Sequence, residues 1–463
     1  MRDAGPPGGR SVTGPTVPAP TGAPDPASLL RSRGYLSLLV LAALIGAPVS
    51  AVAYGFLALV SVLQRFLFED LPADLFGSAP AWWPVPWLAL CGLLTALTIR
   101  YLPGTGGHSP APGFTTGGGP AAGRDLIGIV LAAFTSLSLG AVLGPEAPLI
   151  AIGGGLAALT VRLAKKDAPP MAATVMGSAG SFAAVSTLLG SPLLGAFLIM
   201  EAAGIAGTTL TLVALPGLLA SGVGALVFVG LDSWTGLGTF SLALTTVPPA
   251  ESPTIATMLW AVPVGVVAAL LGWAIRWGAV SLRPLVHRGR VPVTVGLGLL
   301  IGGCAMAYQI ITGNAFTDVL FSGQDALPEL VSNAGTYSLG VLMVLGLFKT
   351  LAYALSLSAF RGGPVFPAMF VGAVLGIGLS GLPGMDLAPA IGMGIGAMSC
   401  AMLRLPLTSV LLATLLMGVD GLQVTPQVVI AVVVAFVVTS AMPTPGPVDR
   451  SDEAEPEHPA DRE

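Results

Sequence analysis

The stretch AVLGPEAPLIAIGGG at residues 141–155 contains a motif that indicates where a helix begins, Gly-Pro-Glu-Ala-Pro. Gly144 permits a sharp turn, and Pro145 and Pro148 suit the first turn of a helix, where a missing N–H costs nothing. The motif therefore predicts a helix start whose first amides have no partner within the helix. Such an end carries partial positive charge and binds anions.

A second copy of this pattern lies in the other half of the chain. Gly-Pro-Val-Phe-Pro at 363–367 repeats the first motif 219 residues later (363 − 144 = 219). Ser-Pro-Leu-Leu at 191–194 is echoed by Leu-Pro-Leu-Thr at 405–408, and their prolines are 214 residues apart (406 − 192 = 214). Two matches in the same order at nearly one offset indicate an internal duplication. Paired interrupted segments in two halves are typical of transporters with a site near the membrane midplane.

Composition places both copies in a membrane. Hydrophobic residues make up 54% of the chain and charged residues 9%, whereas soluble domains carry about 25% charged residues. The 62 glycines and 40 prolines indicate interrupted helices, which lipid tolerates only where protein or a wet cavity covers their ends. Stretches 149–161 and 367–381 are expected to be too short to cross. No apolar run alternates with period two, so we predict an all-α polytopic membrane protein.

The expected organisation is one membrane domain between two tails, lying in the cell membrane in contact with lipid. The tails are rich in Pro, Gly and Ser or in acidic residues and are predicted to be disordered. The predicted bounds are 1–33 for the first tail, 34–442 for the membrane domain with pseudo-repeats at about 34–235 and 250–442, and 443–463 for the second tail.

Glu146 is the most informative residue of the first motif. A carboxylate in an apolar membrane segment is costly unless it is partnered or neutralised. At a helix start it would cap the free amides and occupy the place that an anion would take. We therefore interpret Glu146 as a gate; the alternative is an ordinary helix cap. The predicted anion-binding residues at the two helix starts are Gly144, Ala147, Val365 and Phe366.

Other chemistry has little support in the sequence. The net charge of −4 does not suggest a nucleic-acid partner. Cys91, Cys304 and Cys400 each stand alone in an apolar run, so neither a metal site nor a cofactor is expected. No GxSxG, HExxH or paired-aspartate motif is present, so we predict that the chain is not an enzyme. An unrelated carrier of organic solutes is a further alternative, but it would show more polar residues at midmembrane than Glu146 and Glu201.

The motifs and their order resemble those of the CLC family of chloride channels and proton-coupled chloride transporters. GPEAPLIAIGG is similar to the family's GxExP motif, and RGGPVFPAMF resembles its GxFxP region. Residues 177–204 are similar to a long family stretch that ends in a helix with a glutamate, and GGHSP at 106–110 stands where the family has GSGIP. The resemblance covers residues 35–442. It implies an inverted repeat of many tilted, partly broken helices, and a homodimer with one path for chloride or similar anions in each subunit.

The resemblance is incomplete at the family's central anion site. Where the family has the serine of GSGIP, this chain has Gly107. The resemblance therefore implies that Ser109, or a protonated His108, takes the place of that serine.

The second motif departs from the family as well. Pro364 has no N–H, so one expected donor is missing and Val365 and Phe366 are left to donate. The family's late tyrosine has no counterpart, because no tyrosine follows Tyr353.

Glu201 bears on proton coupling. Proton-coupled members carry a glutamate near the cytoplasmic end of the corresponding helix, usually as the second of two acidic residues, and that position here is Ala202. Glu201 is therefore a candidate for the proton path, and the alternative is a structural carboxylate satisfied by nearby backbone. We expect transport of chloride and similar small monovalent anions through a pore gated by Glu146, with proton-coupled antiport of chloride or fluoride as the alternative.

Two basic clusters lie between the apolar segments. They are interpreted as loop charges that set topology, with attraction of anions to a vestibule as a second interpretation. Arg361 precedes the second motif closely enough to add positive potential at the pore mouth. The clusters are Arg162, Lys165 and Lys166, and Arg283, Arg288 and Arg290.

Overall fold

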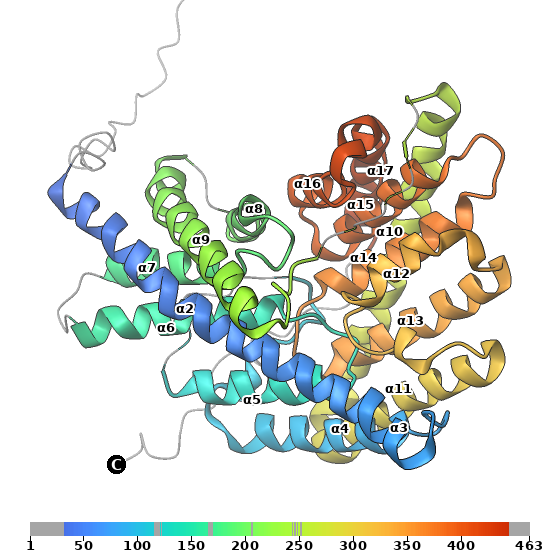
Figure 1. Cartoon of the computed structure of the whole chain (residues 1–463), viewed down its shortest axis with the longest axis horizontal. Helices are drawn as coiled ribbons and strands as arrows, with labels where there is room; N and C mark the ends of the chain where they lie inside the picture. Colours follow the sequence, from blue (N-terminus) through green and yellow to red (C-terminus); the bar gives the residue numbers. More distant parts are fainter. Residues whose placement is uncertain are drawn as a thin grey trace, which may run out of the picture.

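The chain folds into helices that cross one another at many angles (Figure 1). This computed structural model describes residues 32–114, 121, 123–164, 170–204, 207–242, 244, 247, 249–250 and 252–443. The predicted tails lie almost wholly outside the described residues, as do Lys165 and Lys166. No strand forms among the described residues; the β-type pairing there is an isolated bridge between Gly144 and Gly363.

The helices follow the apolar runs of the sequence, and short π-helical or 3-10 turns join several of them. Their bounds are α2 Arg33–Arg65, α3 Leu71–Phe76, α4 Pro84–Tyr101, α5 Asp125–Ser138, α6 Glu146–Ala164, α7 Pro170–Ala184, α8 Pro192–Ala202, α9 Gly207–Thr235, α10 Ile255–Arg288, α11 Arg290–Thr312, α12 Ala326–Ser332, α13 Leu339–Ala359, α14 Val365–Leu379, α15 Leu387–Leu403, α16 Pro406–Leu416 and α17 Gly421–Ala441.

Helix length divides these elements into two groups. Within the described residues, 8 helical segments are long and apolar enough to cross a membrane. Helices α5, α8, α14, α15 and α16 are apolar but shorter. The expectation that 149–161 is too short was wrong, because α6 extends past both ends of that stretch to 19 residues. Helix α14, with 15 residues, stays in the short group.

The duplication indicated by the motifs recurs in the packing. Helix α6 crosses α7 where Gly153 meets Gly180, and a Cβ on either glycine would collide with the other's backbone oxygen. Helix α14 crosses α15 at Gly372 and Gly394 with the same mutual contact. These pairs are related by the two offsets found in the sequence (372 − 153 = 219; 394 − 180 = 214). Small residues let helix backbones touch in a membrane. In each half, the helix that begins at the motif therefore packs on the next helix through the same glycine contact.

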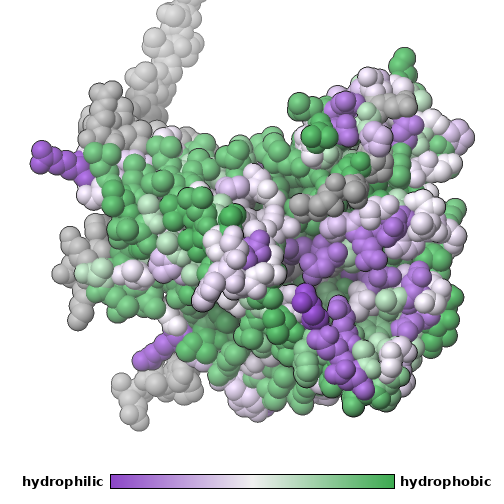
Figure 2. Space-filling model, in the orientation of Figure 1, coloured by the Kyte–Doolittle hydropathy of each residue, from purple (hydrophilic) through white to green (hydrophobic). Residues whose placement is uncertain are grey.

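The outer surface is apolar where lipid would contact it. Large hydrophobic side chains such as Leu226, Ile255 and Val419 are 74%, 80% and 95% exposed. Figure 2 shows this apolar surface over α2 and α9, while hydrophilic residues gather near α12 and the neighbouring loops. The distribution is the inverse of that on a soluble protein and fits helices surrounded by lipid.

Candidate functional site

The two motifs meet in the interior of the molecule. The N–H of Gly144 donates to the carbonyl oxygen of Gly363 at 2.7 Å, and the N–H of Gly363 donates to that of Gly144 at 2.6 Å. This reciprocal pair joins the loop before α6 to the loop before α14. The structure thereby brings the two predicted helix starts, one from each half, side by side.

Each helix start has the same pattern of free amides. Proline occupies the third helical position in both, at Pro148 and Pro367, and supplies no N–H. The next residue in each helix bonds back to the residue before the helix: Leu149 to Pro145 at 3.0 Å, and Ala368 to Pro364 at 3.4 Å. The amides without a partner inside their own helix are therefore those of Glu146, Ala147, Val365 and Phe366.

The Glu146 side chain spans the junction between the halves. It is the first residue of α6 and is 0% exposed. Its Oε1 accepts the N–H of Phe366 in α14 at 2.9 Å, and its Oε2 is buried without a hydrogen-bond partner. One carboxylate oxygen thus occupies an amide at the positive end of the opposite helix, where a small anion would be stabilised.

Two glycines leave room for this carboxylate. A Cβ on Gly144 or on Gly363 would collide with the Glu146 carboxylate, and a Cβ on Gly363 would also lie 3.2 Å from the N of Ala147. The glycines of both motifs are therefore required for space around the carboxylate. Neither has a positive φ, so the expectation that the turn itself needs Gly144 is not supported.

Gly363→Ala is expected to destabilise the protein, and most of that loss should disappear in a Glu146→Ala background. The added methyl group overlaps the carboxylate, and removing the carboxylate removes the overlap. The coupling between the two changes should be about 1–3 kcal/mol. Thermal unfolding of the two single variants and the double variant in detergent measures it. Additive losses would show that the methyl group clashes with backbone instead.

Helix α13 supports both motifs from one side. The hydroxyl of Tyr353, itself 0% exposed, donates to the carbonyl of Pro364 at 2.7 Å. The N–H of Val142, just before the first motif, donates to Ser356 Oγ at 3.0 Å. In the sequence, Tyr353 is distinguished only as the last tyrosine of the chain. Its spacing of three from Ser356 on one face of a helix was the available signal.

The GGHSP segment forms no hydrogen bond with the described residues of this junction, although Arg361, two residues before Gly363, contacts its start. His108 is exposed, whereas the hydroxyl of Ser109 is buried and has no hydrogen-bond partner. Arg361 lies against the start of the segment: its Nη2 donates to the carbonyl of Thr105 at 3.4 Å, and a Cβ on Gly106 would lie 3.4 Å from its Nε. Of the predicted anion-binding residues, the four at the helix starts are brought together, and Ser109 makes no hydrogen bond to them.

Glu201 is also away from the junction, and it caps another helix. Its Oε1 accepts the N–H of Leu407 at 3.0 Å, and its Oε2 accepts the N–H and hydroxyl of Thr408 at 2.7 and 2.6 Å. The end of α8 in the first half thereby caps the start of α16 in the second. Both carboxylate oxygens are engaged, which is the geometry of a structural carboxylate.

Lys349 is fully buried in the middle of α13. Its Nζ donates to the carbonyl oxygens of Asp318, Leu320 and Phe321 at 3.1, 2.7 and 3.3 Å. It also lies 4.6 Å from the ring centroid of Phe370, in a cation–π contact. Burial raises the pKa of the Asp318 carboxyl above its ordinary value. The lysine therefore holds the loop before α12 against α13 and α14.

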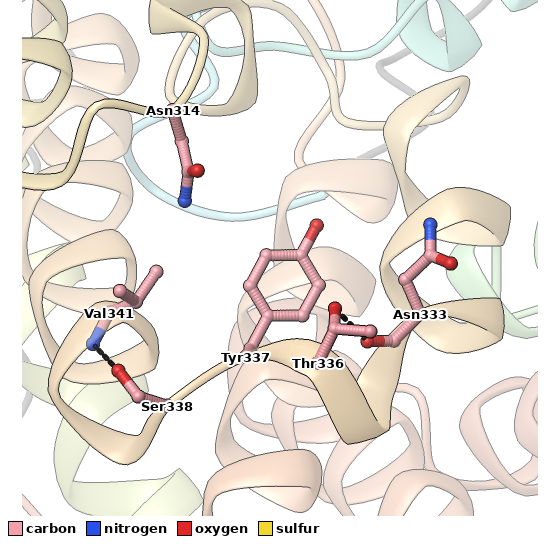
Figure 3. A pocket seen from close by; sticks show the side chains of 6 residues that line it. All are labelled: Asn314, Asn333, Thr336, Tyr337, Ser338 and Val341. Carbon is pink, nitrogen blue, oxygen red and sulfur yellow. Dashed lines mark hydrogen bonds between the residues drawn. The ribbon is translucent and has the colours of Figure 1, made fainter.

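A pocket of about 310 Å³ lies at the start of α13, away from the predicted site (Figure 3). The ring of Tyr337 stands between the side chains of Asn314 and Asn333. No charged residue and no predicted site residue lines it, so it is not part of the predicted anion site. The lining residues are Asn314, Asn333, Thr336, Tyr337, Ser338 and Val341.

Comparison with known proteins places this arrangement in one family. The family described as "Voltage gated chloride channel" matches residues 104–440. A relative from Escherichia coli O17:K52:H18, named "Putative ion-transport protein YfeO", is 30% identical over 384 residues, which is 81% of this chain and 85% of the relative. The protein of the same name from Salmonella paratyphi A is 30% identical over 352 residues, covering 75% and 81% of the two chains.

Solved structures share the fold. A slow cyanobacterial Cl⁻/H⁺ antiporter matches with a TM-score of 0.67 at 18% identity, covering 87% of this chain and 94% of that one. A CLC-type fluoride/proton antiporter matches with a TM-score of 0.64 at 18% identity, covering 89% and 97%. The predicted all-α inverted-repeat fold and the family resemblance are confirmed. Members of this family are channels or transporters, so the chain is not an enzyme. The chain belongs to the CLC family and is a multi-pass membrane protein that transports anions.

Proposed function

We propose that this protein conducts chloride and similar small monovalent anions passively, through a path gated by Glu146. The observation that carries the proposal is the 2.9 Å hydrogen bond from the Phe366 N–H to Glu146 Oε1. The Glu146 carboxylate accepts the amide N–H that would otherwise bind an anion. The carboxylate and a transported anion therefore compete for the same amide. Glu146 therefore acts as a tethered anion that blocks the path until it is displaced or neutralised.

The proposed anion site is built mainly from backbone dipoles. The amides of Ala147, Val365 and Phe366 have no partner within their own helices, and the Phe366 amide is held by Glu146. The absence of a side chain on Gly144 leaves room for the carboxylate. Partial charges hold an anion without binding it so tightly that release becomes slow. A site of this kind discriminates weakly among monovalent anions of similar size.

Proton-coupled exchange is the alternative, and the geometry of Glu201 favours passive conduction. A proton acceptor must release and rebind its proton during each cycle, whereas both oxygens of Glu201 are held by the start of α16. Protonating Glu201 would weaken the cap of α16. We therefore propose that Glu201 is structural.

Liposomes that contain the purified protein and chloride should lose chloride down its gradient, with no steady uphill movement of protons. Bromide and nitrate should pass at rates within about tenfold of chloride, since dipoles discriminate weakly. Chloride efflux and internal pH are recorded together, with protein-free liposomes as the control.

Three results would contradict the proposal. Potassium flux equal to chloride flux would exclude an anion path. A strong preference for fluoride would show that fluoride, and not chloride, is the transported anion. Uphill proton uptake driven by chloride, and lost in Glu201→Gln, would assign Glu201 to a proton path.

We also propose that the protein works in the cell membrane as a homodimer with one path per subunit. Each subunit contains both motifs and closes its own junction, so a single chain supplies a complete path. Exposed apolar side chains on α16 and α17, such as Leu407 and Leu422, are 64% and 82% exposed and offer a surface for a second copy.

A further inference from the structure

Arg276 is a buried cation with too few partners. It lies within the apolar membrane span of α10 and is 6% exposed. Its Nη2 donates to the carbonyl of Pro112 at 3.1 Å, while its Nε is buried without a partner. A guanidinium inside a membrane protein normally pairs with a carboxylate or lines a pathway. One carbonyl does not neutralise its charge.

The surroundings of Arg276 add positive charge. Helix α15 packs on α10 here: a Cβ on Gly272, one turn before Arg276, would lie 2.8 Å from the Cβ of Ala401, three residues before Arg404. Arg404 follows the end of α15 in a left-handed conformation, with φ of 59°, and its Nε is also buried without a partner. Two neighbouring cations in a region of low dielectric repel each other unless an anion lies near both.

No carboxylate of the described residues supplies that anion. Among the described residues, no carboxylate forms an ion pair with Arg276 or Arg404. Glu201, on α8 against the start of α16, has its two oxygens bonded to Leu407 and Thr408. The buried Nε–H groups of the two arginines are therefore left without an acceptor.

Arg276 and Arg404 lie next to two parts of the predicted path, the GGHSP segment and the region around Tyr353 and Glu146. Pro112, which Arg276 contacts, lies three residues after Ser109, whose buried hydroxyl has no partner. On the other side, a Cβ on Gly278, two residues after Arg276, would lie 3.8 Å from the Cβ of Ala354, the neighbour of Tyr353, whose hydroxyl bonds to Pro364 of the second motif. Arg276 thus lies beside the GGHSP segment on one side and close to the Tyr353–Glu146 region on the other.

We propose that Arg276 and Arg404 form a fixed-charge binding site for a small inorganic anion, next to the segment 109–113. The proposal rests on the proposed anion transport, because it places this second site along the same path. An anion there accepts charge-assisted hydrogen bonds from the free Nε–H groups. The site therefore retains an anion more firmly than the dipoles at Glu146 do.

Thermal unfolding under chloride titration tests the site directly. The purified full-length protein is unfolded at rising chloride concentrations, with gluconate keeping the ionic strength constant. Chloride should raise the Tm of the wild type, because a ligand that binds only the folded state stabilises it. In Arg276→Gln the chloride concentration for half of this effect should rise by about tenfold or more, as expected for a lost charge-assisted bond.

Three further variants sharpen the test. Arg276→Lys keeps the charge but loses the planar donor fork, so its midpoint should fall between those of the wild type and Arg276→Gln. Arg33→Gln removes one exposed charge at the start of α2 and should leave the midpoint unchanged. Arg404→Gln should weaken chloride binding as Arg276→Gln does. It provides the same test if Arg276→Gln does not fold.

The outcomes separate this site from the transport proposal. A chloride midpoint that is the same in the wild type, Arg276→Gln and Arg404→Gln would overturn the site, even if liposome flux still depends on Glu146. A midpoint that shifts in both variants would uphold the site, even if wild-type liposomes passed no chloride. A loss of Tm of equal size at every chloride concentration would show that Arg276 only holds the Pro112 carbonyl.

Discussion

Replacing Glu146 by glutamine or alanine is expected to leave the anion path open at neutral pH and to remove most of the pH dependence of flux. The wild-type carboxylate competes for the Phe366 amide while it is charged, and acid neutralises it. Wild-type flux should therefore rise as pH falls, whereas flux in the variants should be high throughout. A charge-assisted hydrogen bond contributes about 1.5–3 kcal/mol, so the gain at neutral pH should be about tenfold to a hundredfold.

Chloride efflux from liposomes across a pH series measures this effect. Glu69→Gln is the matched control, because it removes an exposed carboxylate in the short π-helical turn after α2 and should change neither flux nor its pH dependence. A Glu146→Gln protein that keeps the wild-type pH dependence would disprove the gate, and Glu146 would then be a helix cap.

Lys349→Met should cost about 3–5 kcal/mol of stability and reduce the yield of folded protein. Methionine fills the space but leaves the carbonyls of Asp318, Leu320 and Phe321 without their donor. Each buried carbonyl left unpaired costs about 1–3 kcal/mol, which outweighs the relief of removing one buried charge.

Thermal unfolding in detergent and the fraction of monodisperse protein measure the loss. Leu345→Met, one turn earlier in α13 and also buried, is the control and should cost less than about 1.5 kcal/mol. If Lys349→Met were as stable as this control, the lysine would not be what holds the loop before α12.

The paired motifs allowed the fold to be predicted because each carries its own local physics. Glycine and proline fix where a helix begins, so the starts of α6 and α14 could be placed to the residue. The duplication then related the halves, and the glycine contacts at Gly153 and Gly372 follow the same offset. Helix ends were less predictable: α6 continues past the apolar stretch 149–161 through Arg162 to Ala164.

Partners that come from distant parts of the chain could not be predicted. Glu201 caps a helix 206 positions away, and nothing in its local sequence indicates which helix that is. Arg276 was overlooked although a charge within a membrane span is a signal in itself. The partners of Lys349 could not be predicted either, because they are backbone carbonyls and leave no trace in side-chain patterns.

The reciprocal bridge between Gly144 and Gly363 has a consequence for synthesis of the protein. A ribosome completes the first motif long before it reaches the second, since the two glycines are 219 residues apart (363 − 144 = 219). Until then the Glu146 carboxylate has no Phe366 amide to bind, and the membrane contains only half of the junction. The proposed anion site is therefore complete only after the second half has been made and has closed on the first.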